Sequence, residues 1–235
     1  MSDVYNDALK FWNNAFEMSD EEKEKFLQDV DPENGWKELA SSEKLRDIII
    51  EQLSGCSKVL DYGCGEGWAG ITLNKSGCKD VTSVDVVENA VKLANFLGSA
   101  YDVTSGFKAE CVSSEWISTE KEELFDGIFC SNVIDVLPAD VAEDILKNMS
   151  RIATKDARII VSMNYYKKFE SDPEKNIEIK NGNELYLNGV LRMVSRTDEE
   201  WTGILSKYFE VEKIEYFAWP GENKEARRIF ILRNK

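Results

Sequence analysis

The chain has 235 residues, with 44 acidic and 29 basic side chains and a formal net charge of −15. That charge repels phosphate backbones and anionic membrane surfaces, which disfavours a nucleic-acid substrate and a membrane-bound role. Five cysteines without a C-x-x-C pair and no histidine predict neither a disulfide framework nor a metal site. The N-terminus lacks a signal pattern and no apolar run is long enough to span a bilayer, so we expect a cytoplasmic protein.

The N-terminal segment, residues 1–56, reads as a helical cap that belongs to the same domain as the rest of the chain. Ser19 followed by Glu22 forms a capping box that predicts a helix through about Asp29. The sequence SEKLRDIIIEQL has apolar residues at helical spacing and predicts a second helix that ends near Gly55.

From Lys58 onward, short apolar strands alternate with amphipathic helices. The predicted strands are 58–62, 81–87, 106–111, 125–134 and 158–163, and the predicted helices between them are 66–75, 88–101 and 139–153. This alternation predicts right-handed crossovers and a mostly parallel sheet with helices on both faces. The sequence of residues 57–235 is therefore interpreted as one α/β domain.

The C-terminal part follows a different pattern. Thr197 and Glu200 form a second capping box, and the apolar strands 209–219 and 226–233 are joined by the short segment PGENKE. A short connection predicts an antiparallel hairpin that closes the sheet at seven strands. Between the fifth strand and the last helix, residues 167–196 contain two Asn-Gly pairs, which predict a small β insertion. This insertion is either a decorative edge hairpin or a lid over the ligand site.

A glycine-rich loop follows the first predicted strand in the sequence KVLDYGCGEGWAG. A dinucleotide-binding loop of the form G-x-G-x-x-G requires a third glycine where Trp68 stands, and a phosphate-binding P-loop requires Gly-Lys-Ser/Thr, which is absent. The pattern that remains is D-x-G-x-G-x-G, from Asp61 to Gly67. Glycines after a strand let the backbone approach a ligand closely.

This loop, together with VTSVDVVENAVKLA, resembles the class I S-adenosylmethionine-dependent methyltransferase family. The resemblance implies a three-layer Rossmann-like fold, S-adenosylmethionine as the cofactor and S-adenosylhomocysteine as the product. Asp85 ends the second strand, at the position where the resemblance implies hydrogen bonds to the ribose hydroxyls. The end of the third strand would contact the adenine. The cofactor-binding residues that the resemblance implies are Asp61, Gly63, Cys64, Gly65, Gly67, Asp85, Val86, Glu110, Cys111, Val112, Ser131 and Asn132.

A catalytic base is harder to identify, because many relatives have a histidine where Asp135 stands. Asp135 is one candidate, and it alternatively caps the helix that begins near Pro138. Glu115, Tyr5 and Tyr165 are further candidates, and none of the four is assigned. The family often folds an N-terminal helix over the cofactor. Tyr5, Trp12 and Trp36 therefore either cover the ligand or only anchor the helices.

The function predicted from the resemblance is in-line methyl transfer to a small-molecule acceptor, by a monomer or a homodimer and without nucleic acid. A methyltransferase acting on protein or RNA and a non-catalytic cofactor-binding module are the alternatives. A dehydrogenase is disfavoured by Trp68.

Overall fold

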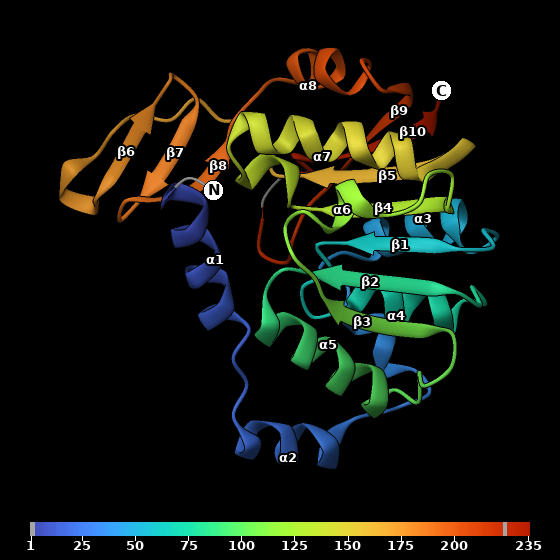
Figure 1. Ribbon diagram of the computed structural model, residues 1–235. Coiled ribbons are helices and arrows are strands. Elements are labelled where there is room, and N and C mark those ends of the chain that lie inside the picture. The colour runs from blue at the N-terminus through green and yellow to red at the C-terminus, as the bar shows by residue number, and fades with distance from the viewer. Residues whose placement is uncertain (1–2, 223–224) are drawn as a thin grey trace.

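The structure is a computed structural model that describes residues 3–222 and 225–235, with side chains described from residue 6 onward. Its centre is a seven-stranded sheet in the order β3-β2-β1-β4-β5-β10-β9 (Figure 1). The strands are β1 (Val59–Tyr62), β2 (Val81–Asp85), β3 (Phe107–Cys111), β4 (Phe125–Ser131), β5 (Ala153–Met163), β9 (Phe209–Phe217) and β10 (Arg227–Asn234). β10 pairs antiparallel with both β5 and β9, while the pairs among β1 to β5 are parallel. The predicted α/β fold class, with its C-terminal antiparallel hairpin, is confirmed.

Helices cover both faces of the sheet. They are α1 (Asp3–Ala15), α2 (Asp20–Asp29), α3 (Glu43–Leu53), α4 (Trp68–Lys75), α5 (Glu88–Ala100), α6 (Trp116–Thr119), α7 (Ala139–Ile152) and α8 (Asp198–Leu205), with short 3-10 turns η1 (Gly35–Glu38), η2 (Ile134–Val136) and η3 (Pro173–Lys175). Both predicted capping boxes are present, at Ser19 with Glu22 and at Thr197 with Glu200. None of the helices in the described ranges has the length and apolar character needed to cross a bilayer.

Strand β4 shows why the sequences of the central strands are nearly continuous apolar runs. Ile128 and Cys130 point into the core cluster that contains residues of α7 and α8, whereas Phe129 points into the cluster formed with α3 and α4. Because both faces are covered, successive side chains are all removed from water. The strand ends at Ser131 instead of continuing to Ile134 as predicted, since Asn132 turns the backbone to a φ of 52°.

The segment after β5 folds into a separate three-stranded sheet of β6 (Ile177–Lys180), β7 (Glu184–Leu187) and β8 (Val190–Val194). Asn188 and Gly189 join β7 to β8 with φ angles of 53° and 79°, the two positive values that a tight hairpin turn requires. The predicted small β insertion is therefore present. Its last strand lies against α1, which stands at the edge of the sheet where β1 and β2 end (Figure 1).

Candidate active site

The glycine loop turns sharply at the carboxyl end of β1. Gly63, Gly65 and Gly67 have φ angles of 70°, 51° and 79°, in the region that strains other residues. A Cβ atom on Gly63 would lie 2.3 Å from Cγ2 of Val133, and one on Gly65 would lie 3.2 Å from the Phe16 ring. The loop therefore needs glycine both for its backbone conformation and for the close approach of the segments around it.

Asp61 stabilises the position of this loop through hydrogen bonds. Its carboxylate is buried and accepts hydrogen bonds from the Gly70 amide, at 3.2 Å, and from the Ser83 hydroxyl, at 3.3 Å. Burial raises the pKa of Asp61 to about 7, against the lowering effect of these two donors. The residue ties the end of β1 to α4 and to β2.

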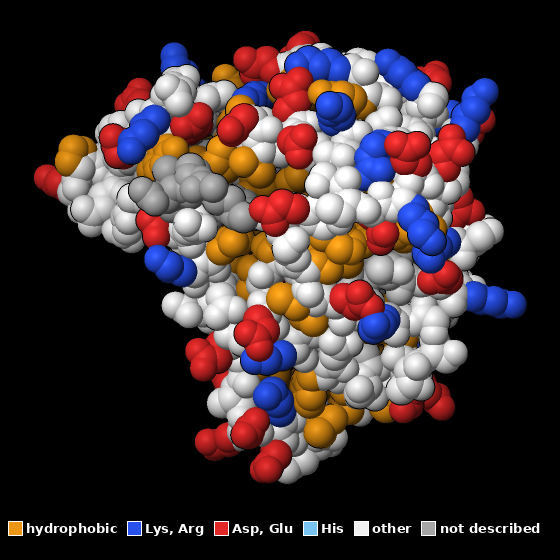
Figure 2. All heavy atoms as spheres, in the orientation of Figure 1, with side chains coloured by type: hydrophobic (Ala, Val, Ile, Leu, Met, Phe, Trp, Pro, Cys, Tyr) orange, Lys and Arg blue, Asp and Glu red, His pale blue; other side chains and the backbone are white. Residues whose placement is uncertain are grey.

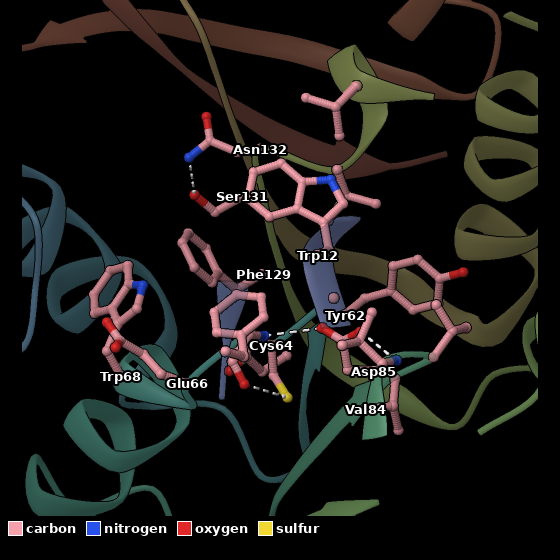
Figure 3. Close-up of a pocket in the computed structure, with 18 of the residues that line it drawn as sticks. Trp12, Tyr62, Cys64, Glu66, Trp68, Val84, Asp85, Phe129, Ser131 and Asn132 are labelled. Carbon is pink, nitrogen blue, oxygen red and sulfur yellow. Dashed lines mark hydrogen bonds between the residues drawn. The ribbon is translucent and has the colours of Figure 1, made fainter. Parts of the chain in front are cut away.

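Asp85, at the end of β2, is held in a fixed orientation by backbone amides. One carboxylate oxygen accepts from the Gly65 amide at 3.0 Å and the other from the Val87 amide at 2.9 Å (Figure 3). Burial raises the pKa of this carboxyl, while the amide donors act in the opposite direction. Each oxygen keeps acceptor capacity after these bonds, so the group is able to receive two neighbouring hydroxyls.

These elements surround a cavity of about 360 Å³. It lies at the carboxyl ends of β1, β2 and β4, on both sides of the point where strand order reverses, which is where open α/β sheets bind ligands. Its volume is within the usual range for ligand pockets. The residues proposed from sequence that line it are Asp61, Gly63, Cys64, Gly65, Asp85, Val86, Val112, Ser131 and Asn132.

Comparison with known proteins agrees with this geometry. Residues 59–156 match the sequence model of a family described as a methyltransferase domain. Residues 59–156 thus carry a methyltransferase domain. The resemblance drawn from the glycine loop and Asp85 is confirmed over this part of the chain.

Individual relatives of the methyltransferase domain differ in what they act on. A ribosomal protein L11 methyltransferase of Thermotoga petrophila is 31% identical over 49% of this chain and 40% of its own length. A ubiquinone biosynthesis O-methyltransferase of Neisseria meningitidis is 25% identical over 66% of this chain and 57% of its own length. The chain thus spans about half the length of these curated relatives.

Among solved structures, a 1,6-didemethyltoxoflavin-N1-methyltransferase of Burkholderia thailandensis superposes with a TM-score of 0.65. It is 18% identical, and the match covers 91% of this chain and 87% of that one. That structure holds 1,6-didemethyltoxoflavin and S-adenosylhomocysteine. At this identity the likeness concerns the fold.

Three of the proposed cofactor residues lie outside the cavity lining. Gly67 is the N-cap of α4, where a Cβ atom would come 2.8 Å from that of Ala94, so its role in the structure is helix packing. Glu110 pairs with Lys108 on the edge strand β3, and Cys111 is exposed. Their contact with a cofactor stays a prediction, whereas Val112, one residue further, does reach the cavity.

Asp135, Glu115 and Tyr165 do not line the cavity. Asp135 is buried, accepts from the Asn164 amide at 2.7 Å, and has no described partner for its other oxygen. The prediction that Asp135 caps the following helix is wrong, because α7 starts after Pro138 without a side-chain cap and Asp135 points toward the end of β5 instead. Tyr165 packs near the Arg227 guanidinium, and the side chain of Tyr5 lies outside the described residues.

The roof and walls of the cavity come from distant parts of the chain. Of the N-terminal aromatics, Trp12 lines the cavity while Trp36 packs in the cluster around Tyr101. Wall residues that were not predicted from the sequence include Phe16, Leu39, Ser41, Tyr62, Glu66, Trp68, Phe129 and Trp219. Trp68 was noted only as a departure from a dinucleotide motif, and nothing near Trp219 in the sequence signals a site.

Proposed function

We propose that this chain transfers the methyl group of S-adenosylmethionine to a small-molecule acceptor bound in the cavity beneath α1. The single observation that carries the proposal is the roofed cavity that joins the Asp85 carboxylate and the glycine loop to the end of β4. Such a cavity admits a small ligand beside a cofactor more readily than a segment of folded protein.

The residues fit the cofactor. Asp85 would hold the two ribose hydroxyls through oxygens already oriented by the Gly65 and Val87 amides. The absence of side chains at Gly63 and Gly65 would let the methionine part lie against the backbone. On the other side, Val112 and Leu137 offer apolar contact for the adenine.

S-adenosylmethionine supplies a methyl group already activated on a positively charged sulfur, so a lone pair on the acceptor displaces the thioether in line. The chain contributes alignment and exclusion of water, which account for much of the rate in such displacements. Trp12 of α1 and Phe16, which follows the helix, line the cavity. Ser131 and Asn132 would orient the acceptor from the end of β4, where Ser131 is itself held by the Ser162 hydroxyl at 2.6 Å.

Methylation of a protein is the second candidate function. It is supported by the relatives named as ribosomal protein L11 methyltransferases, which share about 40% of their length with this chain. On the face shown in Figure 2, Lys and Arg side chains are scattered among Asp and Glu instead of forming one basic patch, which favours neither RNA nor another polyanion. The roof formed by α1 favours the small molecule.

The first test is calorimetric titration with S-adenosylmethionine, S-adenosylhomocysteine and NAD in parallel. Binding of the first two with micromolar affinity and no binding of NAD is the expected result. Incubation with methyl-labelled S-adenosylmethionine and separate dialysable and protein fractions of a cell extract then tests the acceptor class. Label in the dialysable fraction supports the proposal, and label only in protein supports the second candidate. Failure to bind either sulfur compound would overturn both.

A further inference from the structure

The cavity has an unusual distribution of charge. Its described lining includes the carboxylates of Asp61, Glu66 and Asp85 but no lysine or arginine. The whole chain adds a field of the same sign, with a net charge of −15. An anionic group that entered this cavity would therefore lose its hydration without finding a compensating charge, which is costly in an apolar site.

Two arginines contact aromatic residues of the cavity lining, Arg227 at Trp219 and Arg192 at Trp12. Arg227 stacks on the Trp219 ring, with its guanidinium carbon 3.3 Å from the ring centroid, and is paired with Glu222 at 2.7 Å. Arg192 stacks on Phe11, 3.8 Å from the ring centroid, on β8. Neither arginine is part of the cavity lining, so the charge inside stays negative.

Glu66 differs from the other two carboxylates of the cavity. Asp61 and Asp85 each accept two hydrogen bonds from the chain itself. Glu66 has no hydrogen bond or ion pair within the described part of the chain, although it is half-buried, and burial raises its pKa. In Figure 3 its side chain lies next to Trp68, on the side of the cavity away from Asp85.

Aromatic rings also line the cavity, and Trp68 lies next to Glu66 (Figure 3). Trp68 packs edge-to-face on Phe129 with ring centroids 5.5 Å apart, and Trp12 and Trp219 also line the cavity. The faces of indole and phenyl rings attract cations, most strongly where water is excluded. A carboxylate without a partner beside such rings is an environment suited to a positive charge.

We propose that the methyl acceptor of this cavity carries a cationic group, such as an ammonium, and that Glu66 is its counter-ion. The inference rests on the proposed function and specifies its substrate class. Acceptors whose only charged group is a carboxylate or phosphate would be rejected, because no residue of the described lining pairs with them. The amino-acid end of the cofactor is a zwitterion and brings its own compensating charge.

The test compares three probes of similar shape on the full chain saturated with S-adenosylhomocysteine: phenethylamine, 2-phenylethanol and 3-phenylpropanoate. Their binding is followed by the fluorescence of the cavity tryptophans. We expect the amine to bind about tenfold tighter than the alcohol, as one partly desolvated ion pair provides, and the carboxylate to bind weakest. In Glu66→Gln the amine and the alcohol should bind equally. Glu38→Gln, which removes an exposed charge close to the cavity residue Leu39, is the matched control and should keep the preference.

Two outcomes overturn the inference. In the first, the three probes bind alike or 3-phenylpropanoate binds best. In the second, Glu66→Gln loses affinity for S-adenosylhomocysteine while the order of the probes is unchanged, which would assign Glu66 to the cofactor's own ammonium. Both outcomes leave the proposed function standing, whereas an unmodified chain that does not bind S-adenosylhomocysteine contradicts the proposed function itself.

Discussion

The cofactor side of the cavity and its roof are built in opposite ways. The cofactor side is made by one continuous stretch, β1 to β2, in which Asp61, the glycine loop and Asp85 follow each other within the chain. The roof is assembled from α1, the segment before α3, and the connection after β9, which the sequence separates widely. Short-range geometry determines the first region, and long-range packing determines the second.

This contrast shows which cavity residues are positioned by one stretch of the chain and which are positioned by contacts between distant segments. Backbone amides of Gly65 and Val87 orient Asp85, and both belong to the stretch from β1 to α5. In the roof, the contact between α1 and the β insertion depends on the stack of Arg192 on Phe11 and Trp12. Changes on the cofactor side should therefore affect binding directly, and changes in the roof should affect its closure.

The largest effect is expected from Asp85→Ala. The variant loses two charge-assisted hydrogen bonds to the ribose, each worth about 1.5–3 kcal/mol, so affinity for S-adenosylhomocysteine should fall about 100-fold or more. Calorimetry gives the affinity, and circular dichroism checks that the fold is intact. Asp140→Ala, which removes an exposed carboxylate, should bind normally. Undiminished binding by Asp85→Ala would contradict the proposal that Asp85 accepts hydrogen bonds from the ribose hydroxyls.

Gly65→Val should weaken the same binding by about tenfold. Valine at a φ of 51° is strained by about 1–3 kcal/mol, and its Cβ atom would come 3.2 Å from the Phe16 ring, where a bound cofactor also needs space. Gly55→Val is the matched control, since nothing lies within 4 Å of a Cβ atom there. Equal affinity of the two variants would mean that the loop does not approach the ligand.

Asp61→Asn should change how stability depends on pH. In the folded chain the pKa of Asp61 is raised to about 7 by burial, so the folded state holds this proton more tightly than the unfolded state. Its contribution to the free energy of unfolding is therefore present at low pH and is lost as the pH rises through about 7. Urea denaturation at about pH 6 and about pH 8 should show a fall for the natural chain that the variant lacks, by about 1–2 kcal/mol. Parallel pH dependence of the two proteins would contradict this account.

The smallest effect is expected in the roof, from Arg192→Ala. Cation–π stacks of this kind contribute about 0.5–1 kcal/mol, so α1 should open about two- to fivefold more often. The rate of tryptic cleavage within residues 1–18 measures this opening, and affinity for S-adenosylhomocysteine should change less than in Asp85→Ala. Arg192→Lys keeps the charge without the planar stack, so its cleavage rate should lie between those of the natural chain and Arg192→Ala. A cleavage rate equal to that of the natural chain would show that the insertion does not hold α1.

Much of the fold was predictable because it depends on local pattern. The strand and helix alternation from Lys58 onward, both capping boxes and the Asn-Gly turn at Asn188 rest on interactions within a few residues. Asp135 shows the limit of such reasoning. Its position before Pro138 suggested a helix cap, but the partner that it meets is the amide of Asn164, which follows the end of β5 and is distant in the sequence.

The sequence by itself determined the sheet, the glycine loop and the place of Asp85, because backbone conformation and apolar periodicity are set by neighbouring residues. Only the tertiary structure decided which side chains enclose the cavity. Trp219 reaches it from the far end of the sheet, and Glu66 is left without a described partner, because packing brings together segments whose separation in the chain carries no signal. The charge and the aromatic character of the cavity are therefore properties of the folded chain.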